Sequence, residues 1–260
     1  ITDFIIASNT ATVLGKISPS TSVSFFGATS VDLSTDLVVI VGNVATFTGT
    51  GGEILNGTSR LGAATEAVLV NYTSIGANAF DNSALTSITI PNSVTYMDYG
   101  VFKGTGLTSI PTSFPSAITT IPAETFENCI GLTSPLIPTH ITSISYRVFK
   151  GCTGLLSITI PDSVTTISNS AFKDCTSLSS IAIPDSVTSI SSAAFTGCTS
   201  LSSFIVDSAN TTYSDLDGVL FNNDFTTLID YPQGKTDTNY VIPNSLTSIE
   251  ADAFNGTVIT

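Results

Sequence analysis

Apolar and polar positions along most of this chain follow a pattern with a period of about 23 residues. Its clearest copies are LLSITIPDSVTTISNSAFKDCTS at 155–177 and LSSIAIPDSVTSISSAAFTGCTS at 178–200. The phenylalanine of the AF pair marks the register, which recurs at Phe80, Phe102, Phe126, Phe149, Phe172, Phe195 and Phe254. A segment this short cannot bury its own apolar side chains, so the period predicts a solenoid in which each repeat stacks on its neighbours.

Each repeat is predicted to begin with a short strand that ends at a proline corner. In residues 155–177, Ile158 and Ile160 stand two positions apart, so an extended segment directs both toward the core. Ser157 and Thr159 then face outward. The strand ends at the proline, because proline lacks the N–H that a strand ladder needs. The same corner recurs at Pro91, Pro138, Pro161, Pro184 and Pro243.

The remainder of the repeat is predicted to form a second strand and a closing turn. Val164 and Ile167 are the inward positions of the second strand. Ala171, Phe172 and Cys175 follow with the spacing of about one helical turn, which closes the coil. The pattern therefore predicts a mainly β solenoid with short helical turns.

The combined pattern LxxIxIPxSVTxIxxxAFxxCxx resembles the BspA-like class of leucine-rich repeats over roughly residues 66 to 260. The resemblance implies a leucine-rich-repeat solenoid of about seven such repeats. It also implies a non-catalytic bacterial or protist protein, extracellular or on the cell surface, that acts as a scaffold for adhesion. The expected partner is a protein or glycan on another cell or in the matrix.

Two regions interrupt the repeat. Residues 1–62 contain short apolar runs separated by Ser, Thr, Gly and Asn, which predict an N-terminal β-rich cap or a separate small β domain. Residues 63–260 form the predicted solenoid. The interval from Phe195 to Phe254 exceeds one repeat by about 36 residues, so a hairpin insertion is expected at about 207–243. Such insertions are also what the family resemblance implies.

Composition narrows the possible partners. The chain of 260 residues has 20 Asp and Glu against 7 Lys and Arg, a net charge of −13. Nucleic acid is excluded as a natural partner, because no basic stripe is present to replace counterions on phosphates. Mean hydropathy is positive, but the apolar residues are dispersed at repeat spacing and no run approaches about 20 residues. Membrane insertion is therefore not predicted.

The four cysteines share one repeat position, one in each of four successive repeats. They are Cys129, Cys152, Cys175 and Cys198. This spacing predicts a ladder of buried thiols that behave as small apolar side chains. Disulfide pairing of adjacent rungs stays open, because stacked Cα atoms about 5 Å apart meet the geometric requirement. A zinc site is not expected, because a ladder spreads its ligands along a line.

No catalytic, cofactor or metal site is predicted. The single histidine, His140, is interpreted as an exposed turn residue. Glu124 and Glu127 are interpreted as a solvated polar pair on one turn. The acidic stretch DLDGVLFNND at 215–224 lacks the glycine and glutamate that a calcium loop needs at its sixth and twelfth positions, and a hairpin turn near Asn222 explains it.

The candidate interaction surface consists of outward hydroxyl side chains and two tyrosines of the insertion. These residues are Ser157, Thr159, Ser180, Thr165, Thr188, Tyr213 and Tyr231. Such a surface suits recognition of protein or glycan by shape. The chain has no tryptophan, so stacking on a sugar would depend on Tyr or Phe.

An alternative function is a self-assembling extracellular filament or fibre subunit. The sequence stops at NGTVIT without a visible capping segment, which predicts either that a longer parent chain has been truncated or that an exposed strand edge serves as an interface. Contact between this edge and the N-terminal strands of a second copy would be head-to-tail and need not close. The candidate assembly edge consists of Phe4, Ile5, Ile6, Val258 and Ile259.

Overall fold

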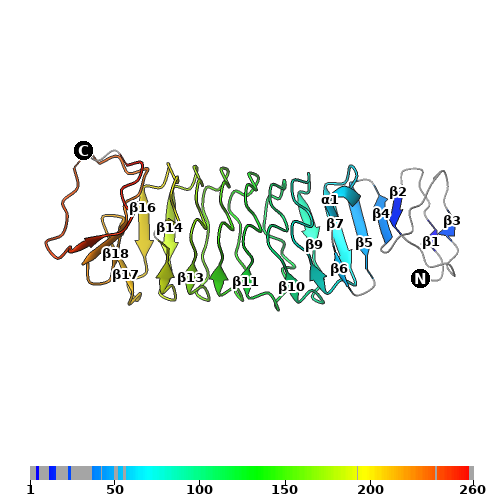
Figure 1. Cartoon of the computed structure of the whole chain (residues 1–260), viewed down its shortest axis with the longest axis horizontal. Coiled ribbons are helices and arrows are strands. Elements are labelled where there is room, and N and C mark those ends of the chain that lie inside the picture. The colour runs from blue at the N-terminus through cyan, green and yellow to red at the C-terminus, as the bar shows by residue number, and fades with distance from the viewer. Residues whose placement is uncertain are drawn as a thin grey trace.

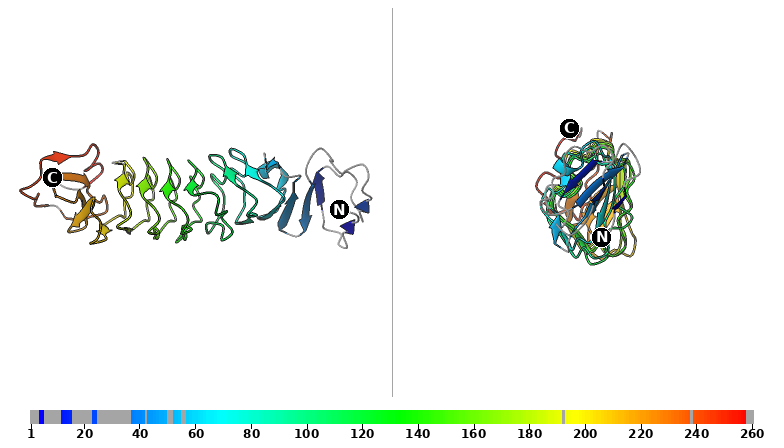
Figure 2. Two further views of the ribbon diagram at one scale, coloured as in Figure 1. Left: turned by 90° about the horizontal axis from the view of Figure 1, so that it is seen from below. Right: turned by 90° about the vertical axis from the view of Figure 1, so that its right-hand side faces the viewer.

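The chain winds as a solenoid along one long axis, from β2 (Thr12–Gly15) near one end to β16 (Ser203–Val206) and the C-terminal residues at the other (Figure 1). The computed structural model describes residues 4–5, 12–15, 23–24, 37–41, 43–49, 52–54, 57–191, 193–237 and 239–257. Viewed along the axis, successive turns superimpose (Figure 2). The predicted solenoid of stacked repeats is therefore confirmed.

The first strand of each repeat stacks in parallel on the first strand of its neighbour. The strands of this series are β5 (Val44–Thr48), β7 (Glu66–Val70), β9 (Ser87–Thr89), β14 (Ser180–Ile183) and β16 (Ser203–Val206). β5, β7 and β9 pair in one sheet, and β14 pairs with β16. Between them, Leu136 and Thr159 form an isolated parallel bridge. Pro135 supplies no N–H to the ladder at this rung.

The second strands form a separate parallel series of two-residue strands. They are β6 (Glu53–Ile54), β8 (Ser74–Ile75), β10 (Tyr96–Met97), β11 (Thr120–Ile121), β12 (Ser143–Ile144), β13 (Thr166–Ile167) and β15 (Ser189–Ile190). The series splits between β10 and β11. Extra residues around Pro111 and Pro115 lengthen the chain between these two strands.

The proline corners form as predicted. At five corners the N–H three residues after the proline donates to the proline carbonyl, at 3.0–3.2 Å. A turn closed in this way needs no N–H from the proline itself, so proline loses nothing there.

The parallel register begins earlier than the sequence pattern predicts. β5 pairs in parallel with β7, so repeat-like stacking crosses the expected boundary at residue 62. β5 also pairs with the antiparallel strand β4 (Leu37–Val41), which pairs with β2 (Thr12–Gly15). Val38 and Phe47 belong to the same core as the repeats. Residues 44–49 and 52–54 therefore belong to a solenoid turn that lacks the sequence signature of one.

The closing turn is not helical, contrary to the prediction from Ala171, Phe172 and Cys175. Among the described residues, the only helix is α1 (Gly57–Arg60). The turn is instead a bent segment in which the N–H groups of Ala171, Lys173 and Cys175 bond to carbonyls three residues back. The intervening N–H groups reach the next repeat, as from Phe172 to the Ala194 carbonyl at 2.9 Å. A helix would use these groups within the turn, so inter-repeat hydrogen bonding decides the local conformation.

Left-handed backbone positions lie two residues before and two residues after the phenylalanine in most repeats. The later position alternates along the rod as Asn82, Gly104, Asn128, Gly151, Asp174 and Gly197. The alternation has a steric cause, because the Asn128 Oδ1 atom occupies the space that a Cβ on Gly151 would need. The same relation holds between Asp174 and Gly197.

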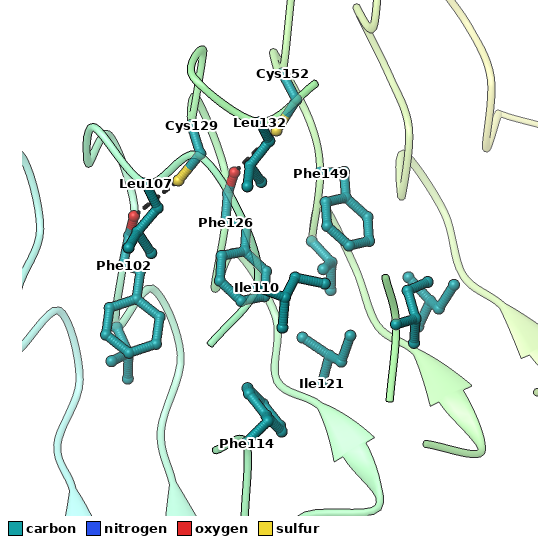
Figure 3. Packing of buried hydrophobic residues seen from close by; sticks show 14 of the residues in the cluster. Phe102, Leu107, Ile110, Phe114, Ile121, Phe126, Cys129, Leu132, Phe149 and Cys152 are labelled. Atoms are coloured by element: carbon teal, nitrogen blue, oxygen red, sulfur yellow. Dashed lines mark hydrogen bonds between the residues drawn. The ribbon is translucent and has the colours of Figure 1, made fainter. Parts of the chain in front are cut away.

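Stacked phenylalanine rings form the centre of the core (Figure 3). Successive centroids from Phe80 to Phe195 lie 5.4–6.0 Å apart, with the ring planes within 21° of parallel. Phe47 closes one end of this column edge-on and Phe204 closes the other. The inward residues predicted for the 155–177 repeat are all buried.

The cysteines form the predicted ladder of buried thiols, and all four are free. Each thiol donates to the carbonyl of the phenylalanine in the preceding repeat, at 3.0–3.1 Å. Figure 3 shows two of these bonds, from Cys129 to Phe102 and from Cys152 to Phe126. Burial raises the pKa of Cys129 to about 11, so its thiol is protonated and unreactive near neutral pH.

The insertion is built into the solenoid rather than projecting from it. Its strands β17 (Tyr213–Leu216), β18 (Val219–Asn222) and β19 (Thr227–Asp230) form an antiparallel sheet. β19 then pairs in parallel with β20 (Ser248–Ile249) of the last repeat. Leu220 and Ile229 enter the main core, whereas Phe221 and Leu228 enter a second core with the last repeat. The sheet is therefore a wall between two cores.

A buried asparagine joins this wall to the preceding repeat. Asn210 donates to the carbonyls of Pro184 and Val187 and accepts from the N–H groups of Thr212 and Tyr213. All four hydrogen bonds of the amide are thus used, as a polar side chain that is 4% exposed requires.

The alternation of Asn and Gly yields a stability prediction. Gly151→Ala should lower the free energy of unfolding by about 1 to 3 kcal/mol, because its φ is 70° and the new Cβ meets Asn128. Gly52→Ala is the matched control, since nothing lies within 4 Å of its Cβ position, and it should change stability by less than about 0.5 kcal/mol. Equal effects of the two substitutions in urea unfolding would contradict this account.

Asp230, at the end of β19, yields a prediction on pH. Burial raises the pKa of its carboxyl from 3.8 to about 8. The folded state therefore holds this proton more tightly than the unfolded state, and stability should fall as pH rises from about 4 to about 8. Asp230→Asn should remove that loss, so the variant should be more stable than the parent above pH 8 and similar to it below pH 4. If the melting temperatures of the parent and the variant differed by the same amount at every pH in this range, Asp230 would not be the group responsible for the loss of stability.

Candidate interaction surfaces

The predicted hydroxyl residues divide into two rows. Ser157 and Thr159 are exposed beside the half-buried Ser180 on the first-strand series, and Thr165 and Thr188 are exposed beside the second-strand series. The second row is partly used by the fold, because the hydroxyls of Thr165 and Thr188 donate to the carbonyl one repeat earlier, at 3.3 and 3.4 Å. Their role in binding remains a prediction.

The prediction that Tyr213 and Tyr231 are exposed on the interaction surface is wrong. Tyr213 is 8% exposed, and its hydroxyl accepts a hydrogen bond from the Ile190 N–H at 2.8 Å, at the end of the second-strand ladder. Tyr231 is 1% exposed and packs against Tyr240 and Phe254. Both side chains seal the wall between the cores, and neither offers a surface to a partner.

The assembly edge lies mostly outside the described residues. Ile6, Val258 and Ile259 are not among the residues that the structure describes. Phe4 and Ile5 form β1 (Phe4–Ile5), which pairs in parallel with β3 (Val23–Ser24). Head-to-tail assembly through these residues stays a prediction.

The interpretation of Glu124 and Glu127 as solvated is also wrong. Glu127 is 3% exposed, and its carboxylate lies 2.9 Å from Lys103 Nζ and 3.1 Å from Lys150 Nζ. Glu124 contacts Lys103 at 2.8 Å and Arg147 at 3.9 Å. The five side chains form one ion-pair network across three repeats. Sequence spacing alone did not reveal it, because each carboxylate finds its partners on the neighbouring repeats.

The other candidate residues have structural roles. His140 is half-buried and lies near Phe114, with ring centroids 6.5 Å apart, so it is less exposed than predicted. The turn at Asn222 is present, because its side chain accepts from the N–H groups of Thr226 and Thr227. In the part of the chain that the structure describes, no group of three or more His, Cys, Asp or Glu side chains is placed to hold a metal ion.

An exposed apolar cluster was missed by the sequence analysis. Ile130, Leu136 and Leu156 are 64%, 75% and 55% exposed. Leu156 takes the place of Thr133 one repeat earlier, as the hydrogen bond from its N–H to the Thr133 carbonyl shows. Ile130 and Leu136 stand three residues before and after Thr133, so the three apolar residues lie on two adjacent repeats. Aligning the repeats reveals them, because other repeats place Thr, Ser, Gly or Ala at most of these positions.

Three exposed tyrosines were missed as well. Tyr96, Tyr99 and Tyr146 are 54%, 48% and 40% exposed, and they stand on and beside the second-strand series. The Arg147 guanidinium carbon lies 4.5 Å from the centroid of the Tyr146 ring. The ion-pair network thus adjoins the exposed aromatic rings.

The network yields a prediction on acid stability. Burial alone raises the pKa of Glu127, but hydrogen bonds from Lys103 and Lys150 outweigh it and hold the pKa below its usual value. Its stabilisation is therefore present above the usual Glu pKa and lost as pH falls through the lowered value. Glu127→Gln should lower the free energy of unfolding by about 2 kcal/mol near neutral pH, because it leaves Lys150 without its ionic partner and Lys103 with Glu124 alone. The difference in the free energy of unfolding between the parent and Glu127→Gln, measured by urea unfolding, should become smaller at acid pH. The same substitution at the exposed Glu53 should leave the free energy of unfolding unchanged at both pH values.

Comparison with solved structures places the fold among bacterial repeat proteins. A leucine-rich cell surface protein from Faecalibacterium prausnitzii A2-165 is 27% identical with a TM-score of 0.63, over 85% of this chain and 66% of that chain. A leucine-rich repeat protein from Eubacterium ventriosum ATCC 27560 is 23% identical with a TM-score of 0.50, over 86% and 55%. The pneumococcal vaccine antigen PcpA is 17% identical with a TM-score of 0.52, over 85% and 60%. This chain thus spans less than two thirds of each protein.

A search of curated proteins finds no significant match. Among the described residues, no helix has the length and apolar character needed to cross a membrane. The family model for the BspA type leucine rich repeat region matches residues 66–175 and 119–234, with six copies. These matches cover more than half of the sequence, and they coincide with the stacked repeats of the structure. The chain therefore belongs to the BspA-type leucine-rich repeat family.

Proposed function

We propose that this protein is a non-catalytic binding scaffold at the cell surface, and that its first-strand face contacts a protein on another cell or in the matrix. The first-strand face is the set of outward residues on and between β9, β14 and β16, together with the adjoining Ile130 and Leu156. The observation that carries the proposal is the exposure of Ile130, Leu136 and Leu156 on an otherwise hydroxyl-lined surface.

The physical reason is that these exposed apolar side chains do not stabilise the fold of the isolated chain. Thr89 and Thr159 occupy the position of Leu136 in other repeats and allow the same backbone, so folding does not require leucine there. Exposed apolar side chains that gather in one region are typical of contact sites. Burying three of them against a partner would contribute several kcal/mol at about 25 cal/mol per Å².

The rigid spacing of the face supports the same proposal. Ala182 pairs with Ile205, which is 55% exposed, so the row of outward residues continues to the last strand of the series. A pre-organised surface pays little conformational entropy on binding. The similarity to a cell surface protein supports display outside the cell, and the net charge of −13 disfavours nucleic acid and anionic lipid as partners.

Substitution by the repeat's own consensus residue tests this function. The double variant Leu136→Thr with Leu156→Thr should fold normally, because threonine stands at both positions in other repeats. Binding of labelled protein to immobilised matrix proteins and to intact cells should fall by about tenfold or more. Ile249→Thr, an equivalent change of an exposed residue in β20, is the control and should bind like the parent. Unchanged binding by the double variant would contradict the proposed role of this face.

A further inference from the structure

Comparing equivalent positions in the repeats singles out the exposed tyrosines. Tyr96 takes a place in the second-strand series that holds Glu53 at the start of the series and Ser or Thr in the other repeats: Ser74, Thr120, Ser143, Thr166, Ser189 and Ser248. Tyr99 and Tyr146 take a place that holds Ala77, Ala123 and Asn169 in other repeats. The backbone therefore forms at these sites without an aromatic side chain.

The fold gains little from these rings. They are 40–54% exposed, whereas the described Phe side chains of the core column are fully or almost fully buried. Two charged residues on this edge are also unusual, because Glu124, after Ala123, and Arg147, after Tyr146, have φ of 60° and 56° where other repeats use Asn, Gly, Ser or Asp. Side chains that the repeat does not need, on a backbone conformation that disfavours them, indicate a role outside folding.

The solenoid sets the spacing of the rings along the rod. The Gly100 N–H donates to the Ala123 carbonyl, and the Glu124 N–H donates to the Tyr146 carbonyl, both at 2.9 Å. Tyr99, Ala123 and Tyr146 therefore stand on three successive rungs. The two tyrosines are two rungs, or about 10 Å, apart, with only the small Ala123 side chain between them. This is the length of a disaccharide unit in an extended pyranose chain.

Polar groups suited to sugar hydroxyls adjoin the rings and are held in place. Glu124 is tied to Lys103 and Arg147 by ion pairs at 2.8 and 3.9 Å. Arg147 also stacks on Tyr146, and the Asp98 carboxylate accepts a hydrogen bond from the Tyr99 N–H at 2.7 Å. Carboxylates and guanidinium groups form the stronger, charge-assisted hydrogen bonds to hydroxyl groups. Aromatic ring faces pack against apolar C–H surfaces.

We propose that this edge, made of Tyr96, Tyr99 and Tyr146 with Glu124 and Arg147, binds an extended neutral polysaccharide. Sugar rings two residues apart stack on Tyr99 and Tyr146. A sugar fits better than a protein, because the exposed aliphatic residues that a protein interface would bury lie on the other face, at Ile130, Leu136 and Leu156. An uncharged ligand also meets no repulsion from a chain with a net charge of −13. The site is separate from the first-strand face and goes beyond the function proposed for it.

The test is affinity electrophoresis of the whole chain in native gels that contain hydroxyethylcellulose, laminarin, glycogen, galactomannan or arabinoxylan. At least one of these polysaccharides should retard the parent protein. Tyr99→Ala with Tyr146→Ala should raise the apparent dissociation constant by about tenfold or more. Alanine is the natural residue at the equivalent positions 77 and 123, so this variant should keep the parent's melting temperature. Tyr99→Phe with Tyr146→Phe keeps the ring faces and should retain most of the retardation.

Three results would overturn the proposal. The first is that none of the five polysaccharides retards the parent, and the second is that the alanine variant is retarded like the parent. The third is that the alanine variant loses binding to immobilised matrix proteins instead, which would make the edge a protein surface. The variant Leu136→Thr with Leu156→Thr should be retarded like the parent, so failure of this site and failure of the first-strand face are distinguishable.

Discussion

Each repeat depends on hydrogen bonds that it cannot make by itself. A coil this short has no internal ladder, so its N–H and carbonyl groups must find partners on the neighbouring rungs. This constraint forces successive backbones to superimpose, including two left-handed positions in the closing turn. The alternation of Asn128 with Gly151, and of Asp174 with Gly197, follows from it, because the side chain of one rung fills the space over the next. The thiols obey the same constraint by bonding to carbonyls one repeat earlier.

The insertion shows how the constraint is met when the repeat is interrupted. An added segment has to offer hydrogen-bonding partners to the repeats on both of its sides. On one side of the β17–β19 sheet, the Tyr213 hydroxyl accepts a hydrogen bond from the Ile190 N–H. On the other side, β19 pairs with β20. Its two faces then bury residues in separate cores. The insertion is thus a structural joint between the main core and the last repeat.

The inward side chains of every repeat must stack on the same positions of the next repeat, so the residue types of the repeats differ mainly at outward positions. Serine and threonine are the default there, since they are small and bond to nearby backbone, so departures from them are informative. Such departures include the exposed Leu136, Leu156 and Ile205 on the first-strand series and the tyrosines at Tyr99 and Tyr146. Four of the chain's seven basic residues also lie on the closing-turn edge beside these tyrosines: Lys103, Arg147, Lys150 and Lys173. One rod therefore presents chemically different surfaces.

The sequence by itself determined the solenoid, the inward residues, the proline corners, the cysteine ladder and the family. These features are periodic, and a period states which residues stack on each other without any knowledge of distant contacts. Only the tertiary structure decided that the closing turn is not helical, that stacking begins before residue 62, and that Tyr213, Tyr231 and Glu127 are buried. In each case the deciding partner lies on another rung or across the insertion. The hydrogen bonds and ion pairs that bury these groups form between segments whose proximity the local pattern does not specify.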